Sequence, residues 1–146
     1  MELKIIKKRE MAVIPKYSTN GAAAADLYAC IEENIILKPG DRVLVPTGIA
    51  ISLPSKDYVA LVFARSGLAI KKGICLTNGV GVIDSDYRGE ISVGLCNMSD
   101  EPYTILVNER IAQLAIMPVI PVIFKETSNL DQTERENNGF GSTGRK

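Results

Sequence analysis

Five stretches of the 146-residue sequence carry side chains that could handle phosphate, water or a metal ion. In chain order they are "AAAADLYA" with Asp26, "ARSGLA" with Arg65, "NGVGVIDSDYRGEI" with Asp84, "ERIAQL" with Gln113, and the terminal "RENNGFGSTG". Guanidinium groups, hydroxyls and exposed backbone amides bind phosphate oxygens, whereas a carboxylate can activate a water molecule. The chain has no histidine and no tryptophan, so His-based triads and His-metal sites are excluded.

The last of these stretches contains a glycine pattern that also occurs in dinucleotide-binding proteins. Gly139, Gly141 and Gly144 have the spacing G-x-G-x-x-G. That pattern binds a pyrophosphate only when a strand precedes it and a helix follows it. Only Arg145 and Lys146 follow the last glycine, so there is no room for a helix. The glycines therefore need another explanation.

Taken one at a time, the other stretches have simple structural explanations as well. Asp26 follows four alanines and could be a turn residue, and Ser66 could cap a short helix. The sequence "DSDYRG" could be a hairpin turn with its charges in solvent. Arg110 and Gln113 could mark the solvated face of a strand. No single stretch decides between a plain fold and a phosphate site.

The elements that must position these residues are mostly strands. Apolar residues alternate with smaller or polar ones over residues 48–53, 90–95 and 103–107, and short β-branched runs occupy 42–46 and 121–124. Turn signals at 38–41, 53–57, 85–89 and 97–102 separate many of these runs. Short strands at this spacing predict an all-β sandwich or jelly roll. The one expected helical turn is "SGLAIKKG", residues 66–73.

Composition limits the partners and the compartment. Lys and Arg together number 17, as do Asp and Glu, so no net field attracts nucleic acid or an anionic membrane. Cys30, Cys75 and Cys96 form no Cys-x-x-Cys pair, which indicates buried thiols in a reducing compartment. No apolar run has the length of a signal peptide or a membrane span. We therefore expect a cytoplasmic protein without nucleic-acid or membrane partners.

The five stretches, in this order from Ala22 to Gly144, resemble the ordered motifs of the trimeric deoxyuridine triphosphatases (dUTPases). The resemblance implies a jelly-roll-like β-sandwich or barrel subunit over residues 1–125 and a flexible C-terminal arm over 126–146. It further implies a homotrimer whose active sites are shared between chains. Such enzymes hydrolyse dUTP to dUMP and pyrophosphate with Mg2+, which limits uracil in DNA and supplies dUMP for thymidylate synthesis.

The resemblance also implies a role for each matched residue. Asp84 corresponds to the general base for the attacking water, and Tyr87 to the ring that packs against the sugar. Asp26 corresponds to the carboxylate that holds magnesium through its water shell. The uracil pocket corresponds to Asn78 and the backbone from Gly79 to Ile83, which includes Gly81 and Val82. The remaining substrate-binding positions are Arg65, Ser66, Gly67 and Gln113 for the phosphates, and Arg135, Phe140, Gly141, Ser142 and Thr143 in the arm that closes over the nucleotide.

The sequence departs from the common motifs in three places. Ala64 replaces a frequent proline, "GV" at 79–80 replaces a frequent Ser-Pro, and Glu136 and Asn138 replace glycines in the arm. Arg135 and Phe140 keep the family spacing, and no matched catalytic position is lost. Two alternatives remain open: a dCTP deaminase-like enzyme, and a regulatory protein whose nucleotide-gated surface controls a partner. Ammonia release from dCTP tests the first, and an inserted segment would favour the second.

Overall fold

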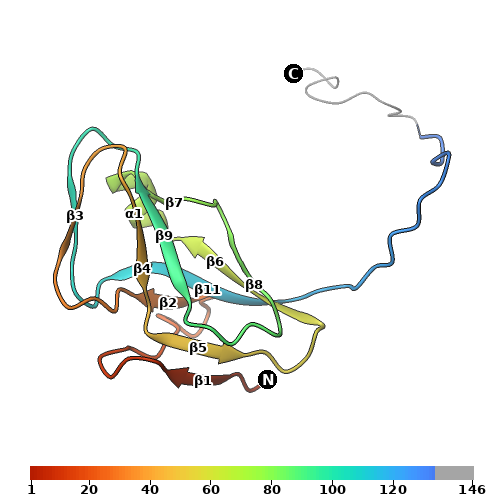
Figure 1. The fold of residues 1–146 in the computed structure, drawn as a ribbon, viewed down its shortest axis with the longest axis horizontal. Helices are drawn as coiled ribbons and strands as arrows, with labels where there is room; N and C mark the ends of the chain where they lie inside the picture. Colours follow the sequence, from red (N-terminus) through yellow and green to blue (C-terminus); the bar gives the residue numbers. More distant parts are fainter. Residues whose placement is uncertain (134–146) are drawn as a thin grey trace.

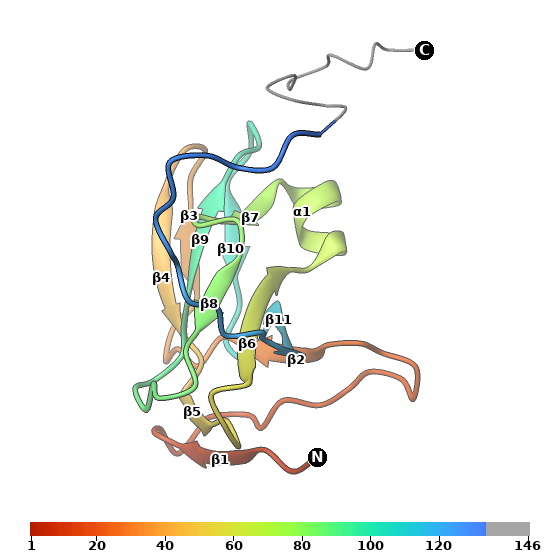
Figure 2. The same cartoon turned by 90° about the vertical axis from the view of Figure 1, so that its right-hand side faces the viewer.

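The computed structural model describes residues 1–133, which form antiparallel strands and one short helix (Figures 1 and 2). The β1–β5 ribbon and α1 lie at opposite ends of the body in both views. The strands are β1 (Lys4–Lys7), β2 (Ala25–Tyr28), β3 (Ile35–Leu37), β4 (Arg42–Pro46), β5 (Ile49–Ser52), β6 (Tyr58–Ala64), β7 (Ile74–Leu76), β8 (Gly81–Ile83), β9 (Ser92–Asn97), β10 (Tyr103–Ile105) and β11 (Arg110–Pro118), and the helix is α1 (Ser66–Lys72).

The strands pair in four sheets. Two are two-stranded, β1–β5 and β10–β3, one is three-stranded in the order β4-β9-β7, and one is four-stranded in the order β2-β11-β6-β8. The nine-residue strand β11 is the longest and pairs on both sides, with β2 and with β6. The four-stranded sheet therefore joins segments from the beginning, middle and end of the described chain.

One hydrophobic core lies between these sheets, and the alternation of residues in the strands explains it. Along β9, Val93, Leu95 and Asn97 are buried, whereas the residues between them are half-buried. Ile49 and Ile91 are fully buried and belong to the same cluster. Since successive strand residues point to opposite faces, the period of two in the sequence specifies which side faces the core.

The predicted all-β class is confirmed, because strands dominate and the helix is short. The barrel alternative is wrong for residues 1–133: the strands pair in four separate sheets, and no sheet closes on itself. The jelly-roll arrangement and the homotrimer remain predictions at this stage. No helix among residues 1–133 is long and apolar enough to cross a membrane.

The predicted helical turn over residues 66–73 is confirmed as α1 and its C-cap. Leu68 is the buried residue that anchors it, and Gly73 ends it with a φ of 67°. Glycine adopts this left-handed conformation without steric penalty. Arg65, not Ser66, occupies the N-cap position, and no side chain caps the helix. The interpretation of Ser66 as a helix cap is therefore wrong, because Ser66 is already the first helical residue.

The β-branched run at 121–124 does not form a strand. The main chain of Val119 donates a hydrogen bond to the Asp57 carbonyl at 2.7 Å, and the chain then extends away from the sheets (Figure 1). Ile120, Ile123 and Phe124 are 85%, 96% and 94% exposed. Pro121 lacks the N–H that a ladder needs, and no strand of residues 1–133 pairs with this run. The boundary predicted at 125/126 remains a prediction.

The three cysteines are free thiols, and they differ in burial. Cys30 is buried in the core, and burial raises the pKa of its thiol. Cys75 and Cys96 are half-buried and lie opposite each other on β7 and β9. The expectation of buried thiols is thus confirmed for Cys30 and is wrong for the other two, because their strand positions face away from the core.

Asn97 is a buried polar residue that ties three segments together. Its side-chain nitrogen donates to the carbonyls of Leu37, at 2.9 Å, and Glu101, at 2.7 Å. Its side-chain oxygen accepts from the backbone and the hydroxyl of Ser99. One amide thereby connects the end of β9 with β3 and with the turn that precedes β10.

We expect Asn97→Ala to lower the free energy of unfolding by about 1 to 3 kcal/mol, because buried partners lose their hydrogen bonds. Urea unfolding followed by circular dichroism measures this change. Asn20→Ala is the matched control, since Asn20 is exposed and should change stability little. Equal stability of the two variants would contradict a structural role for the Asn97 amide.

Candidate active site

Asp26 is the centre of a charged cluster in the four-stranded sheet. It lies within β2 and is 7% exposed. One carboxylate oxygen, Oδ1, pairs with Nε of Arg65 at 3.0 Å, and the other, Oδ2, pairs with Nη1 of Arg110 at 3.2 Å. Oδ2 also accepts a hydrogen bond from the Ser18 hydroxyl at 2.8 Å. The interpretation of Asp26 as a turn residue is wrong, because it is a buried strand residue neutralised by two guanidinium groups.

Strand register explains how three distant stretches reach this cluster. Asp26 lies opposite Gln113 on β11, and Gln113 lies opposite Phe63 on β6. Arg65 directly follows β6, and its Nη1 donates to the Arg110 carbonyl at 3.0 Å. The Gln113 amide donates to the Ala64 carbonyl at 3.0 Å. The first, second and fourth stretches therefore meet within one chain.

An irregularity in β11 accompanies this arrangement. The pairing of β11 with β2 shifts register between Arg110 and Ala112. Ile111 and Ala112 are both buried, whereas Arg110 is exposed and reaches Asp26. A bulge of this kind re-aims side chains next to it. It lets a strand with two consecutive core residues present a guanidinium beside the buried carboxylate.

Ser66 and Gly67 lie beside the cluster, at the start of α1, and both are exposed. The first helical hydrogen bond runs from the Ala69 N–H to the Arg65 carbonyl. The amides that precede Ala69 therefore have no partner within the helix. The geometry leaves a hydroxyl and backbone amides available to an anion next to the Arg65 guanidinium.

The third stretch forms a separate group. Residues 77–80 connect β7 to β8, and residues 84–91 connect β8 to β9, so both segments cross between the three-stranded and four-stranded sheets. The interpretation of "DSDYRG" as a hairpin turn is therefore wrong. Asp84 and Tyr87 instead line one open cavity of about 300 Å³. The other residues that line it are Leu44, Val82, Ile83, Glu90, Ile91 and Ser92.

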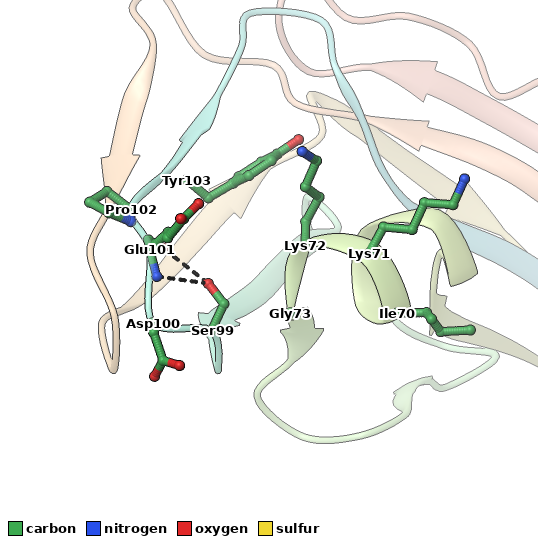
Figure 3. Close-up of a pocket in the computed structure, with 9 residues that line it drawn as sticks. All are labelled: Ile70, Lys71, Lys72, Gly73, Ser99, Asp100, Glu101, Pro102 and Tyr103. Atoms are coloured by element: carbon green, nitrogen blue, oxygen red, sulfur yellow. Dashed lines mark hydrogen bonds between the residues drawn. The ribbon is translucent and has the colours of Figure 1, made fainter.

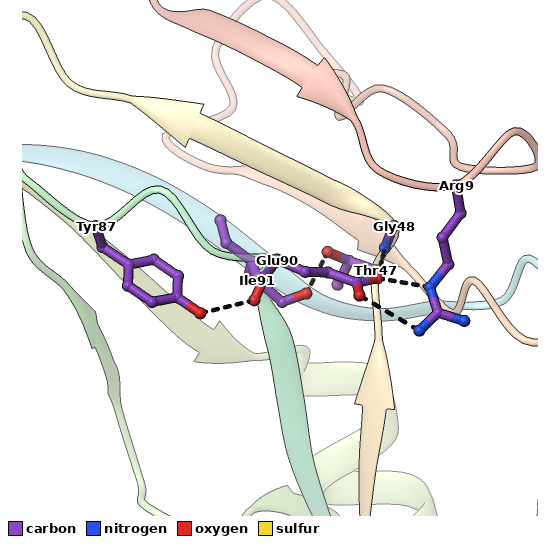
Figure 4. A network of polar contacts seen from close by, with 6 residues as sticks. All are labelled: Arg9, Thr47, Gly48, Tyr87, Glu90 and Ile91. Atoms are coloured by element: carbon purple, nitrogen blue, oxygen red, sulfur yellow. Dashed lines mark hydrogen bonds and ion pairs between the residues drawn. The ribbon is translucent and has the colours of Figure 1, made fainter.

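The Tyr87 ring has a defined position over the backbone of its own loop. Its hydroxyl donates to the Glu90 carbonyl at 3.0 Å (Figure 4). A Cβ atom at Gly89 would lie 2.5 Å from Cζ of that ring, closer than any side chain tolerates. Glycine is therefore required at position 89 for the ring to lie where it does. This contact explains why "DYRG" ends in glycine.

The predicted uracil-pocket residues extend from the turn before β8 along that strand to Asp84. Asn78 is exposed, and its carbonyl accepts from the Val80 N–H at 2.8 Å in a tight turn. Gly79 has a φ of 69°, which gives a reason for glycine at this departure from the family pattern. Gly81 is buried against Val62, whereas Val82 is 62% exposed. The backbone of residues 79–83 thus leads from the turn to Asp84.

Asp26 and Asp84 are far apart in the subunit. Three strand spacings separate β2 from β8 in the sheet. Across the paired strands, Asp26 is level with Phe63 of β6. Asp84 is level with a residue of β6 that lies four positions before Phe63. With about 4.8 Å per spacing and about 3.3 Å per residue, the backbone positions of the two residues lie roughly 20 Å apart along the sheet. A triphosphate chain is too short to contact both. The structure therefore divides the predicted site of one chain into two groups.

The predicted residues of the arm and the predicted metal site differ in what the structure describes. Arg135, Phe140, Gly141, Ser142 and Thr143 lie outside the residues that the structure describes. Within residues 1–133, no group of three or more His, Cys, Asp or Glu side chains is placed to hold a metal ion. A metal at Asp26 would therefore depend on ligands from outside the described protein residues.

A cavity larger than the one beside Asp84 contains none of the predicted residues. It measures about 490 Å³ and lies between the end of α1 and the turn before β10 (Figure 3). Lys71 and Lys72 line it together with Asp100 and Glu101, so its charges are mixed. The hydrogen bonds between Ser99 and Glu101 close one side of the turn. Size alone therefore does not identify the functional site.

Some residues of the two groups were not predicted as site residues. Arg110 interrupts an apolar strand, and that polar interruption was the available signal for its role. Ser18 lies eight residues before Asp26 in a loop, and no pattern indicates its contact. Glu90 follows "DYRG" directly, but only the structure shows that it lines the cavity with Asp84.

Comparisons with known proteins identify the family of this chain. The family model for dUTPase matches residues 10–144. The deoxyuridine 5'-triphosphate nucleotidohydrolase of Neisseria meningitidis serogroup A is 47% identical over 144 residues, covering 99% of this chain and 96% of the relative. The protein of the same name from a Hydrogenobaculum species is 49% identical over the full length of both.

Solved structures give the same result. A mutant dUTPase of Staphylococcus bacteriophage 80alpha with dUpNHpp superposes with a TM-score of 0.88 at 25% identity, and the match covers 98% of both chains. A second structure of the phage enzyme, also with dUPNHPP, superposes with a TM-score of 0.88 at 26% identity over the same share of both chains. Since the family model spans nearly all of the sequence and the relatives are nearly half identical over 96% or more of their length, the chain belongs to the dUTPase family.

Proposed function

We propose that this protein hydrolyses dUTP to dUMP and pyrophosphate, in the cytoplasm and without nucleic-acid or membrane partners. The observation that carries the proposal is that Asp84 and Tyr87 line one cavity, next to the backbone of residues 81–83. A carboxylate for water, a ring for the sugar and a backbone edge for the base are thereby adjacent. Family membership supports the same reaction.

Asp84 acts as the general base of the reaction. Its exposed carboxylate accepts a proton from a water molecule as the water oxygen bonds to the α-phosphorus. The bond from the α-phosphorus to the oxygen that bridges to the β-phosphorus breaks, and pyrophosphate leaves with that electron pair. The leaving group already carries charge, so catalysis depends mainly on positioning and on neutralising that charge.

The sugar and the base are selected beside Asp84. The Tyr87 ring packs against the deoxyribose and leaves no space for a 2'-hydroxyl. Asn78 and the backbone of Gly81, Val82 and Ile83 read the edge of uracil. Backbone groups left unpaired by the wrong base make such discrimination strong.

The Asp26 cluster holds the phosphates. Arg65, Ser66 and Gly67 supply a guanidinium, a hydroxyl and backbone amides, and Gln113 lies near the α-phosphate. The Asp26 carboxylate has about four acceptor positions. Three donors, from Arg65, Arg110 and Ser18, already occupy three of them. The remaining position suits a water molecule better than a direct bond to a metal.

The residues present therefore fit a hydrated Mg2+ that arrives with the nucleotide, and Asp26 would hold it through one of its waters. Magnesium keeps several waters and takes phosphate oxygens directly, which matches a site with a single carboxylate. When bound, the ion neutralises charge on the triphosphate. Arg65 and Arg110 balance the negative charge of Asp26 when no ion is present.

The active unit is a homotrimer in which each site uses residues from several chains. The roughly 20 Å between Asp26 and Asp84 supports this arrangement, because one nucleotide needs both groups. The exposed apolar run from Ile120 to Phe124 supports it too, since a run of this kind favours burial against another chain. Residues 1–125 form the jelly-roll domain, and residues 126–146 form the flexible arm.

The arm closes over the nucleotide bound by a neighbouring chain. Phe140 lies on the uracil ring, while Arg135, Gly141, Ser142 and Thr143 hold the γ-phosphate. From Thr127 to Phe140 an extended chain reaches roughly 43 to 47 Å, enough to cross a subunit. Ordering the arm costs roughly 1 to 2 kcal/mol per residue in backbone entropy. Contacts to a bound triphosphate offset that cost, so the arm orders only with nucleotide.

The role of Asp84 is tested by removing its charge. We expect Asp84→Asn to reduce kcat for dUTP about 100-fold or more while the nucleotide still binds, because the amide keeps the shape and loses the base. Pyrophosphate release measures turnover, and calorimetry with a non-hydrolysable dUTP analogue measures binding. Asp86→Asn is the matched control, since Asp86 is exposed and does not line the cavity. Retention of more than about a tenth of the wild-type rate rules out Asp84 as the base.

Sugar selection is tested at Tyr87. Tyr87→Ala should raise the ratio of kcat/KM for UTP to that for dUTP by about tenfold or more, because the 2'-hydroxyl gains space. The same assay applied to Tyr17→Ala provides a control, since Tyr17 is exposed and lies outside the cavity. An unchanged ratio in Tyr87→Ala means that another residue selects the sugar.

The sharing of sites between chains has its own test. Two variants are prepared: one lacks residues 134–146, and the other carries Asp84→Asn. Each variant by itself should form a folded trimer that is nearly inactive. Co-assembled, the two should recover activity, because the arm of one chain closes over the Asp84 of another. Mass spectrometry establishes subunit exchange. Mixed trimers that exchange subunits and stay inactive would show that the arm serves its own chain.

A further inference from the structure

Glu90 makes contacts in two directions at the end of the loop that carries Asp84 and Tyr87. Its carboxylate oxygen Oε1 accepts from Nε of Arg9 at 2.8 Å and from the Gly48 N–H at 2.9 Å. The other oxygen, Oε2, accepts from Nη2 of Arg9 at 3.3 Å. Its backbone carbonyl accepts the Tyr87 hydroxyl at 3.0 Å (Figure 4). One residue thus links the Tyr87 ring to two distant segments.

The groups that hold the Glu90 carboxylate differ in rigidity. Gly48 lies in a packed turn: a Cβ there would come within 2.6 Å of Ala12 and of the Cys30 sulfur. The Gly48 N–H is therefore a fixed donor. Arg9 belongs to the segment after β1, and its side chain is 46% exposed. The bidentate pair from Arg9 is charge-assisted and constrains the direction of the carboxylate.

The main chain beyond Glu90 is held as well. Ile91 is fully buried, and its N–H donates to the Ile49 carbonyl at 2.9 Å. The Ile91 carbonyl accepts from both the hydroxyl and the N–H of Thr47. The peptide group of Glu90 is therefore held from its side chain and from the next residue. Together these two restraints fix the orientation of the Glu90 carbonyl toward the Tyr87 hydroxyl.

The main chain of Tyr87 is held by hydrogen bonds to the Asp84 carbonyl and from the Arg88 guanidinium, but its ring has fewer restraints. The ring is 45% exposed, and its one hydrogen bond within residues 1–133 goes to the Glu90 carbonyl. Gly89 makes room for the ring but does not attract it. The position of the ring therefore follows the position of that carbonyl.

We propose that Glu90 and Arg9 are positioning residues for substrate selection: they fix the carbonyl that holds Tyr87 and so set how closely the ring approaches the sugar. Both act through the Tyr87 ring rather than on the reacting atoms. This inference rests on the proposed role of Tyr87 in excluding a 2'-hydroxyl. It extends that role to Arg9, which lies 81 positions from Glu90 in the sequence.

The kinetic test uses Arg9→Gln, which removes the charge from an exposed residue and should leave the fold intact. We expect the ratio of kcat/KM for UTP to that for dUTP to rise about three- to tenfold, less than the ~100-fold that a full 1 Å misplacement can cost. Arg9→Lys should restore part of the discrimination. Lys8→Gln is the control, since Lys8 is the neighbouring exposed cation and has no ion pair among residues 1–133.

A second measurement does not depend on activity. The chain has five tyrosines, so fluorotyrosine-labelled protein gives a simple 19F NMR spectrum, and Tyr87→Phe assigns the resonance of interest. We expect Arg9→Gln and Glu90→Gln to shift or broaden the Tyr87 resonance and to leave the other four in place. Lys8→Gln should leave all five unchanged.

The outcomes separate this inference from the proposed function. If the wild type does not hydrolyse dUTP, or Tyr87→Ala leaves sugar selection unchanged, the proposed function fails, and the NMR spectra still test the positioning. If Tyr87→Ala changes selection while Arg9→Gln and Glu90→Gln alter neither the ratio nor the Tyr87 resonance, the positioning role is overturned. A lowered melting temperature with unchanged selection and spectrum would likewise assign Arg9 a purely structural role.

Discussion

The two-sided pairing of β11 is the constraint on which the rest of the structure depends. This strand pairs along most of its length with β6 and at its start with β2. Because antiparallel register fixes which residues face each other, the pairing alone brings Asp26, Gln113 and the end of β6 to one place. A slip of one residue would move Gln113 to the opposite face and separate Arg110 from Asp26. The Asp26 cluster is thus a consequence of sheet register.

The same pairing makes the burial of Asp26 tolerable. A buried carboxylate without partners would lose several kcal/mol of solvation, so it needs donors that are equally well placed. Arg65 and Arg110 supply charge, and Ser18 supplies a hydroxyl. Arg110 remains 47% exposed in its side chain while it pairs with Asp26. The cluster therefore neutralises a buried charge with guanidinium groups that still face solvent, where an anion can reach them.

Sequence periodicity predicted the parts of the fold that follow from local chemistry. The alternation in β9, the run that forms β4 and the glycine that ends α1 all follow from residues within one segment. The prediction of a strand at 121–124 was wrong because β-branched residues form a strand only where a partner strand exists. The prediction of Ser66 as the helix cap was wrong because the helix begins at Ser66 itself, whereas a capping serine precedes the first helical residue.

The candidate site, like the fold, could be predicted from the sequence only in part. The five candidate stretches could be picked out from the sequence, because the residue types within each stretch are a local feature. Their grouping was not, because the contact of Arg110 with Asp26 spans 84 positions and the contact of Arg9 with Glu90 spans 81. Such pairs depend on which strands are neighbours, and no pattern within a segment contains that information. Two groups that lie roughly 20 Å apart on one sheet cannot approach each other by loop motion, because the paired strands between them are rigid. The precision of each group therefore rests on how firmly the strands beside it hold its residues in place.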